Sequence, residues 1–323
     1  MMPLTEFSLI ERYFASITQP ASPYVDLAIG DDCCLLSIPD TMQLAQSIDT
    51  LNANIHFPAE ANADLIAQRA LAVSVSDLAA MGASPVAFSL AISMPELSEP
   101  WLAAFSRGLQ QAARHYGIAL IGGDTTKGPL SLTLHVQGVV AKGRALQRHG
   151  ASVGDCIFVT GSLGDAAAAL AFMQGQLPVA KSAQQFFKQR YYQPSARVAV
   201  GQSLHDIATA AIDVSDGFIA DLGHIARRSA VGAVVDVSLL PVSAELQANA
   251  SAEQALSYAL SGGDDYELCF TAPSDKRAQL LELSELIDVA ITEVGTIVAG
   301  EGVRCIDEQG REIILSESGY QHF

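Results

Sequence analysis

The chain has 323 residues, of which 50% are hydrophobic and 16% are charged. This composition excludes an intrinsically disordered chain, and the length predicts two domains rather than one. The formal net charge is −17 with only 18 lysines and arginines, so there is no basic surface for bulk nucleic acid. An acidic protein still binds a polyanion when metal ions supply the positive charge.

The N-terminus lacks the basic and then apolar order of a signal peptide, and no apolar run is long enough to cross a membrane. The number of cysteines is odd and no C-x-x-C spacing occurs, which predicts buried, reduced thiols rather than a metal or redox site. These cysteines are Cys33, Cys34, Cys156, Cys269 and Cys305. We therefore expect a cytoplasmic protein with no membrane association.

Hydrophobic periodicity predicts alternating helices and strands in the first half of the chain. In chain order these are a helix at 6–16, strands at 25–29, 33–38 and 43–48, a helix at 62–81, a strand at 86–93, a helix at 100–116, and strands at 118–121 and 130–140. The polar, glycine-bearing stretch 142–155 is the best candidate for a domain boundary, and we place the two domains at 1–148 and 149–323.

The pattern of strands and helices restarts after this boundary. The predicted elements are a strand at 156–160, a helix from 165, helices at 183–191 and 196–208, a strand at 210–214, a helix ending at 229, and mixed elements from 232 onward. Asp216 is the expected N-cap of the helix that ends at 229. Both halves mix the two kinds of element, which predicts an α/β (α+β) fold in two domains.

Six short segments each place one or two aspartates directly after an apolar, strand-like run. They are Ile29–Asp32, Ser47–Thr50, Val75–Asp77, Gly122–Thr125, Ile212–Gly217 and Gly262–Asp265. Strand ends deliver their side chains to a sheet edge, where several carboxylates with nearby hydroxyls suit Mg²⁺. Neighbouring glycines permit close approach of a phosphate to the backbone. Together these features predict a metal-dependent phosphoryl-transfer enzyme.

The alternative for any single aspartate is a turn former or helix cap, and only the agreement of six segments favours metal binding. Gly122-Gly123-Asp124 fits neither a P-loop nor a G-x-G-x-x-G fingerprint. Arg148 is either a nucleotide contact or a solvated surface arginine. No H-x-x-x-H pair and no G-x-S-x-G motif occurs, so we expect metal ligands and a phosphate cradle without a protein nucleophile.

Nearly the whole chain resembles the thiamine-monophosphate kinase family, within the superfamily that includes aminoimidazole ribonucleotide synthetase and selenophosphate synthetase. The order and spacing of five segments carry the resemblance: Gly30–Cys33, Asp77–Gly82, Gly122–Thr126, Asp213–Gly217 and Ser261–Leu268. The resemblance implies transfer of the γ-phosphoryl group of ATP to thiamine monophosphate. It also implies a homodimer, in which the N-terminal α/β domain contributes strands to a barrel at the interface and the C-terminal α+β domain closes over the cleft.

The resemblance assigns roles by position. It implies Mg²⁺ ligands at Asp32, Ser47, Asp49, Asp77, Asp124, Asp213 and Asp216. It implies ATP contacts at Tyr116, Gly123, Asp124, Arg148 and Ser215, and thiamine phosphate contacts at His56, Asp264 and Tyr320. This chain has Ile48 where the family usually has Thr, and Asp264 where the family usually has Glu. No side chain is expected to act as a catalytic acid, base or nucleophile, because positioning and metal charge suffice.

Two other classes of function remain open at the level of sequence. One is a different ATP-dependent synthetase of the same superfamily, although the reactive N-terminal cysteine or selenocysteine segment of selenophosphate synthetase is absent. The other is a non-enzymatic protein that binds divalent cations or nucleotides. ATP binding with and without Mg²⁺, followed by an assay of ADP release on thiamine monophosphate, distinguishes these classes.

Overall fold

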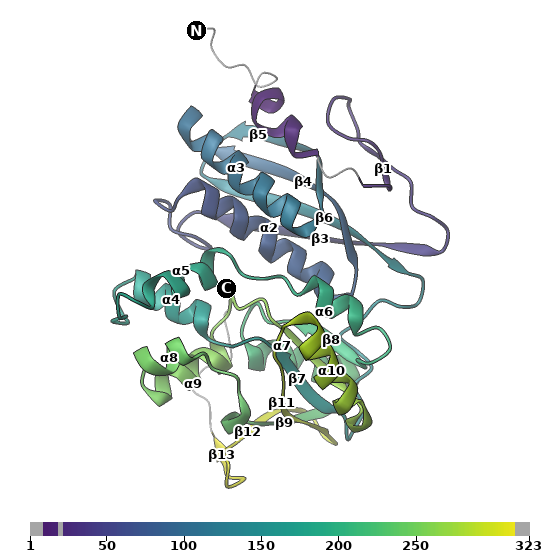
Figure 1. Cartoon of the computed structure of the whole chain (residues 1–323), viewed down its shortest axis with the longest axis vertical. Helices are drawn as coiled ribbons and strands as arrows, with labels where there is room; N and C mark the ends of the chain where they lie inside the picture. The colour runs from purple at the N-terminus through teal and green to yellow at the C-terminus, as the bar shows by residue number, and fades with distance from the viewer. Residues whose placement is uncertain (1–8, 19–21, 314–323) are drawn as a thin grey trace. The chain divides into compact units, whose positions relative to one another are not determined.

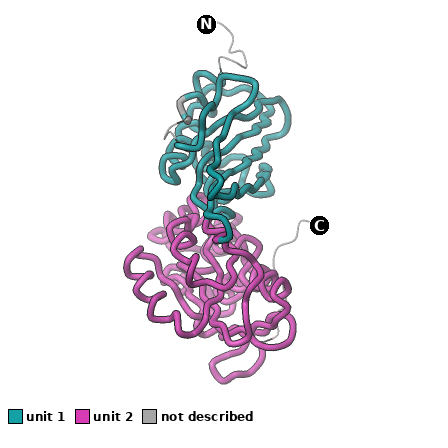
Figure 2. The backbone as a smooth tube through the Cα atoms, turned by 90° about the vertical axis from the view of Figure 1, so that its right-hand side faces the viewer, with its two compact units in different colours: residues 1–78, 83–143 teal, residues 79–82, 144–323 magenta. Residues whose placement is uncertain are grey.

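The computed structural model describes residues 9–18 and 22–313, which fall into two compact units (Figure 2). Unit 1 consists of Met1–Leu78 and Ala83–Gly143, and unit 2 of Ala79–Gly82 and Arg144–Phe323. Each unit combines helices with a β-sheet, which confirms the mixed α/β character of both halves. Among the described residues, no helix is both long and apolar enough to span a membrane.

Unit 1 contains a four-stranded sheet in the order β3-β6-β4-β5, in which only β4 and β5 run parallel. The strands are β3 (Met42–Asn52), β4 (Ser84–Met94), β5 (Ala119–Lys127) and β6 (Ser131–Ala141). Helices α2 (Ala63–Ala80) and α3 (Glu99–Tyr116) lie on one face of this sheet (Figure 1). A Cβ at Gly108 of α3 would lie 2.1 Å from the Asp64 carbonyl oxygen of α2, so glycine permits the two helices to pack closely.

Side chains of β3 alternate between the two faces of the sheet, as a strand requires. Leu51 is buried, whereas Leu44 and Ile48 are 40% and 64% exposed. Two short strands, β1 (Val25–Leu27) and β2 (Leu35–Leu36), pair with each other and pack against Ala87 and Val139 of the sheet. Segments η1 (Ile10–Phe14) and η2 (Ala15–Thr18) precede them. The face that carries Ile48 therefore keeps an exposed apolar part.

Unit 2 is built on a seven-stranded sheet with helices on both faces, in the strand order β13-β12-β9-β11-β7-β10-β8. The strands are β7 (Cys156–Thr160), β8 (Ala210–Asp213), β9 (Gly232–Asp236), β10 (Leu268–Ala272), β11 (Ile291–Val298), β12 (Gly302–Ile306) and β13 (Glu312–Ile313). The helices are α4 (Asp165–Met173), α5 (Gln184–Tyr192), α6 (Val198–Ser203), α7 (Phe218–Ser229), α8 (Ala244–Asn249), α9 (Ala252–Ser261) and α10 (Arg277–Ile287).

Strand β7 shows how the sheet separates two hydrophobic cores. Ile157 and Val159 point into a core with Leu222 of α7 and Leu260 of α9. Phe158, on the opposite face, packs with Leu204 after α6 and Leu280 of α10. Burial of both faces explains the continuous apolar character of β7 and β10.

The last residues of α2 belong to unit 2. Ala79 and Ala80 are part of the core that contains Leu204 and Phe270. The Met81 carbonyl oxygen accepts a hydrogen bond from the Leu146 amide at 3.1 Å. A Cβ at Gly201 of α6 would lie 2.0 Å from the Ala79 carbonyl oxygen, so glycine lets α6 approach this segment. Four residues from the first half of the chain thus belong to unit 2, and two of them, Ala79 and Ala80, form part of its hydrophobic core.

Candidate active site

Ser47 and Asp49 lie on β3 and approach Asp77 of α2. The Ser47 hydroxyl donates a hydrogen bond to Oδ2 of Asp77. Burial, and to a lesser extent the charge of Asp77, raise the pKa of the Asp49 carboxyl to about 6, against a weaker opposing hydrogen bond from Ser74. Oδ2 of Asp49 is buried and has no hydrogen-bond partner among the described residues. A buried oxygen without a partner is costly unless something else binds it.

The Ser47, Asp49 and Asp77 side chains offer donors that fit a divalent cation. Two carboxylates and a hydroxyl are hard oxygen ligands, and Mg²⁺ is usually bound by one or two carboxylates together with waters and substrate phosphates. Residues 9–18 and 22–313 hold no group of three or more His, Cys, Asp or Glu side chains suited to a metal ion. Because Mg²⁺ is octahedral, one oxygen from each of Ser47, Asp49 and Asp77 would leave coordination positions for phosphate oxygens and water.

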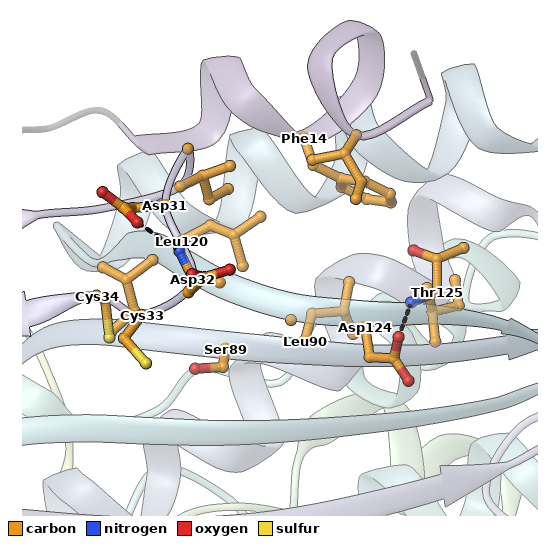
Figure 3. Close-up of a pocket in the computed structure, with 17 residues that line it drawn as sticks. Phe14, Asp31, Asp32, Cys33, Cys34, Ser89, Leu90, Leu120, Asp124 and Thr125 are labelled. Atoms are coloured by element: carbon orange, nitrogen blue, oxygen red, sulfur yellow. Dashed lines mark hydrogen bonds between the residues drawn. The ribbon is translucent and has the colours of Figure 1, made fainter. Parts of the chain in front are cut away.

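A cavity of about 610 Å³ lies in unit 1, between the segment that precedes β1, the loop before β2 and the paired strands β4 and β5 (Figure 3). Its apolar lining includes Phe14, Leu90 and Leu120, and its polar lining includes Asp31, Asp32 and Asp124. An apolar wall beside a carboxylate-bearing, glycine-rich edge is suited to a nucleotide base and its metal-bound phosphates.

Gly123 lines this cavity and pairs with Leu90 of β4. A Cβ at this position would lie 1.9 Å from the Leu90 carbonyl oxygen, so no other residue fits without movement of a strand. Oδ1 of Asp124 accepts a hydrogen bond from the Thr125 amide at 2.9 Å, and Oδ1 of Asp31 accepts one from the Asp32 amide at 2.8 Å. These bonds fix the backbone beside both predicted ligands, Asp32 and Asp124.

Cysteine burial was predicted only in part. Cys156, Cys269 and Cys305 are buried and free, in agreement with the sequence. Cys33 is exposed and Cys34 is half-buried, and both line the cavity. The prediction of burial is wrong for Cys33 because the chain forms a loop there and β2 begins only at Leu35.

In unit 2, the loop between β8 and α7 carries Asp213, Ser215 and Asp216. Asp213 is the buried last residue of β8, and Asp216 is exposed. The Ser215 and Asp216 amides donate hydrogen bonds to Oδ2 of Asp221 at 2.9 and 3.0 Å. Burial raises the pKa of the Asp221 carboxyl to about 7 despite these bonds. Asp221 was not among the residues singled out from the sequence.

The loop between α9 and β10 carries Asp264 and is joined to the β8–α7 loop. The Asp264 amide donates to the Ser215 carbonyl oxygen at 2.9 Å, and the Tyr266 amide donates to that of Val214 at 2.8 Å. The Tyr266 hydroxyl donates to Oδ1 of Asp264 at 3.1 Å. Asp264 and Tyr266 have φ angles of 70° and 51°, a left-handed conformation that is uncommon for residues other than glycine and that is often found at functional sites.

Asp265 and Glu267 of the same segment point into unit 2 and anchor it. Asp265 accepts hydrogen bonds from the Gly164 and Ala166 amides at the start of α4. Glu267 binds Arg197 through two hydrogen bonds of 2.6 and 2.7 Å, and it also accepts from Arg190 and Thr160. The second aspartate of Gly262–Asp265 is therefore an internal anchor rather than an exposed ligand.

The remaining predicted contacts are distributed over both units. Arg148 is exposed, and its charge lies near His224 of α7, whose pKa is lowered first by burial and then by Arg227 and Arg148. The negative charge of Asp216 has the opposite effect and raises the pKa of the His224 imidazole. Arg148, Ser215, Asp216 and Asp264 thus gather around the β8–α7 loop.

Two predicted contacts lie in unit 1, and one predicted residue is not described. His56 follows β3, and its Nδ1 accepts a hydrogen bond from the Asn52 amide at 3.0 Å. Tyr116 is half-buried at the end of α3, in edge-on contact with His115. Tyr320 lies outside the described residues.

The expectation that every aspartate follows a strand end is wrong for three segments. Asp49 lies inside β3, Asp124 lies inside β5, and Asp77 lies on α2. Both strands continue past these acids because the pairing of β3 with β6 runs on to Asn52 and the pairing of β5 with β4 runs on to Lys127. Asp77 falls within the helix predicted at 62–81, which the structure confirms as α2.

The prediction that Asp216 caps α7 is also wrong. The N-cap residue is Gly217, whose lack of a side chain leaves the cap without a side-chain acceptor. Asp221, one turn into the helix, accepts the loop amides instead. The sequence signal was an aspartate five residues after Asp216 and one turn into a helix that has a glycine as its N-cap.

Comparison with known proteins identifies the family. Two family models match the chain: AIR synthase related protein, N-terminal domain, over residues 30–140, and AIR synthase related protein, C-terminal domain, over residues 152–308. Thiamine-monophosphate kinase of Escherichia coli K12 is 48% identical over 324 residues, covering 100% of this chain and 99% of that protein. The chain belongs to the thiamine-monophosphate kinase family.

Solved structures of thiamine-monophosphate kinases share this fold. The crystal structure of the enzyme from Stenotrophomonas maltophilia K279a is 46% identical, with a TM-score of 0.87 over 96% of this chain and 98% of that one. The structure of AaThiL complexed with AMPPCP and TMP is 28% identical, with a TM-score of 0.79 over 100% of this chain and 98% of that one. The family resemblance predicted from the sequence motifs is thereby confirmed.

Proposed function

We propose that this chain is an ATP-dependent kinase that converts thiamine monophosphate to thiamine diphosphate by direct in-line phosphoryl transfer. The observation that carries this proposal is the 48% identity to a thiamine-monophosphate kinase over the full length of both chains. The complex of a related kinase with AMPPCP and TMP supports the same pair of substrates, because AMPPCP is an analogue of ATP. The reaction belongs to the biosynthesis of thiamine diphosphate.

The chemistry requires positioning rather than a protein nucleophile. The acceptor is a phosphate oxygen, and a phosphate monoester is largely dianionic at pH 7, so no general base has to activate it. Holding donor and acceptor in line and offsetting their repulsion are the remaining tasks. This agrees with a site that offers carboxylates, hydroxyls and backbone amides.

Mg²⁺ ions would be held by Ser47, Asp49 and Asp77, with further oxygen ligands from Asp32, Asp124, Asp213 and Asp216. Bound there, they would neutralise charge on the two phosphate groups. The unpartnered buried Oδ2 of Asp49 supports this assignment, because a cation would satisfy it. The net charge of −17 also supports metal binding, because the chain has few cationic side chains to neutralise a polyphosphate.

The nucleotide would occupy the unit 1 cavity along Gly123 and Asp124, with Tyr116, Arg148 and Ser215 as further contacts. Gly123 presents backbone without a side chain, which suits close approach of a phosphate. Thiamine monophosphate would be bound by His56 and Asp264, together with Tyr320. Asp264 is one methylene shorter than glutamate, and the hydrogen bond from Tyr266 holds its carboxylate in place.

A homodimer is the second part of the proposal. Ile48 and Leu44 expose an apolar surface on the open face of the four-stranded sheet. Covering this face with the same face of a second copy would close the two sheets into a barrel. In this arrangement residues 1–148 bind ATP and Mg²⁺ and form the dimer, while residues 149–323 complete the active site.

The test is conversion of thiamine monophosphate by the purified protein with ATP and Mg²⁺, followed by measurement of thiamine diphosphate and ADP. Equimolar formation of the two products is expected, together with no product from free thiamine, which lacks the acceptor phosphate. ADP release that is independent of thiamine monophosphate would contradict the proposal and favour another synthetase. ATP binding of equal affinity in excess EDTA would exclude the metal-dependent mechanism.

A further inference from the structure

Resting on the proposed function, we infer that Asp221 is a positioning residue that fixes the β8–α7 loop and thereby orients Asp216 and Ser215 toward the metal-bound nucleotide. Asp221 touches neither substrate in this scheme. It acts by holding the backbone of Ser215 and Asp216, which are the proposed contacts to nucleotide and metal. Because the Ser215 carbonyl oxygen accepts from the Asp264 amide, Asp221 also supports Asp264 indirectly.

The contacts of Asp221 are directed at the loop and not at the surface. Its side chain is buried, with the residue only 3% exposed. One carboxylate oxygen, Oδ2, accepts from both the Ser215 amide at 2.9 Å and the Asp216 amide at 3.0 Å. The Asp221 amide in turn donates to the Gly217 carbonyl oxygen at 3.0 Å. Both ends of the loop are therefore tied to one residue of α7.

The conformation of Gly217 explains why this task falls to a residue inside the helix. Gly217 has φ 122° and ψ 142°, a region that L-residues rarely adopt. A Cβ there would also lie 2.8 Å from the Ser261 carbonyl oxygen. A serine, threonine or aspartate cap is therefore excluded at this position, and the Asp221 carboxylate instead accepts the amides of the two residues that precede Gly217.

The backbone of Val214 and Ser215 also supports the loop between α9 and β10, which carries Asp264. The Ser215 carbonyl oxygen accepts from the Asp264 amide, and the Val214 carbonyl oxygen accepts from the Tyr266 amide. A Cβ at Gly263 would lie 2.3 Å from the Ser215 carbonyl oxygen, so the two loops are in direct contact. Release of Ser215 and Asp216 from Asp221 would consequently loosen Asp264 as well.

The alternative is that Asp221 merely stabilises α7. Asp155 provides a matched control, because it is also a buried carboxylate of unit 2 that accepts a backbone amide, from Ser152 at 2.9 Å, and a hydroxyl, from Thr209 at 2.7 Å. It holds no residue of the β8–α7 loop. Asp155→Ala therefore reports the general effect of removing a buried acid from this unit.

The experiment compares Asp221→Ala, Asp221→Asn and Asp155→Ala in two measurements on the whole protein. Hydrogen exchange without ligand should show faster exchange of residues 214–217 and 263–266 in Asp221→Ala only. Calorimetric titration with ATP in the presence of Mg²⁺ should show affinity weakened by about tenfold or more in Asp221→Ala, since residues that orient metal ligands have effects of this size. Asp221→Asn keeps an oxygen acceptor and should recover most of the affinity.

Unchanged exchange in the two loops, or an equal loss of affinity in Asp155→Ala, would overturn the inference. If Asp221→Ala does not fold, Asp221→Ser carries the same expectation, because its shorter side chain cannot reach the Ser215 amide. Both measurements omit thiamine monophosphate. A failure of the proposed kinase reaction in the wild-type protein would thus be seen separately from a failure of this inference.

Discussion

Asp49 combines three properties that a structural aspartate rarely shares. It is half-buried, it lies beside the charge of Asp77, and its buried Oδ2 has no hydrogen-bond partner among the described residues. A carboxyl whose pKa is raised by folding destabilises the folded protein above that pKa. In the protein without ligand, this cost is present at neutral pH and disappears as the pH falls from about 6 toward the ordinary value of 3.8.

We predict opposite effects of Asp49→Asn on turnover and on stability. Turnover should fall by about 100-fold or more, because a charged ligand close to the transferred phosphoryl group is lost. The melting temperature of the ligand-free protein in EDTA should stay level or rise by about 2–4 °C at pH 7.5, since a buried charge has been removed. The gain should vanish near pH 4.

Asp40→Asn is the control, because Asp40 is an exposed carboxylate in the turn before the same strand. It should leave both turnover and melting temperature unchanged. Near-wild-type turnover of Asp49→Asn would refute the metal-ligand assignment, whatever its stability.

The hydroxyl of Tyr266 allows a test of the loop between α9 and β10, which carries the proposed substrate contact Asp264. Tyr266→Phe removes the hydroxyl that donates to Asp264 and keeps the ring. The Michaelis constant for thiamine monophosphate should rise about three- to tenfold, as expected for the net contribution of one typical hydrogen bond, while that for ATP stays constant. Tyr258→Phe removes a hydroxyl from α9 and serves as the control. A change confined to kcat, or an equal rise with Tyr258→Phe, would count against the role of Tyr266.

At the scale of elements, the close pairing of β4 with β5 at Gly123 restricts which residues unit 1 can hold there. Gly123→Ala would place a methyl group 1.9 Å from the Leu90 carbonyl oxygen, so the strands must separate. We expect a loss of about 1–3 kcal/mol in unfolding free energy and weaker ATP binding. Gly122→Ala, whose Cβ would have no atom within 4 Å, should leave the unfolding free energy unchanged. Equal denaturation midpoints for the two variants would show that the strands adjust freely.

Periodicity predicted most elements because burial of one helix or strand face leaves a direct trace in the sequence. The helix at 62–81 and the strand at 156–160 correspond closely to α2 and β7. The contacts of acids were harder to predict, because they depend on partners far along the chain. Nothing in the residues around Asp77 shows that it meets Ser47, and the buried position of Asp265 depends on amides at the start of α4.

The site residues were predicted from motifs for metal, ATP and substrate contacts, so a residue such as Asp221, which has none of these roles, was missed. Asp221 accepts from the backbone amides of Ser215 and Asp216, and a sequence pattern that selects ligands for metals does not detect such an acceptor. Gly217 was the available clue, since a glycine N-cap has no side chain to accept backbone amides near the start of the helix, and a nearby acid can accept them instead. The same reasoning identifies Asp265 as the acceptor for α4, which begins with Gly164.

At the scale of the whole molecule, the exposed face of β3 allows a test of association. Ile48→Glu places a charge on the proposed dimer face, where Ile48 is 64% exposed in one chain. Burying an unpaired charge in an interface is strongly unfavourable, and symmetry places it there twice. The dissociation constant, measured by analytical ultracentrifugation, should rise by about 100-fold or more. Leu286→Glu, at a leucine that is 82% exposed on α10, should have no effect. A monomeric wild-type protein would refute the dimer.

The membership of Ala79–Gly82 in unit 2 limits how the gene can be divided. A fragment that begins at Arg144 lacks Ala79 and Ala80, and the apolar side chains around Leu204 and Phe270 then lose part of their cover. Such a fragment would expose this surface to water and self-associate. Truncation or domain exchange at Arg144 thus separates unit 2 from its own segment Ala79–Gly82. Recombination within this family is expected to keep the segments that correspond to 79–82 and 144–323 together. A single cut in the gene never yields a complete second unit.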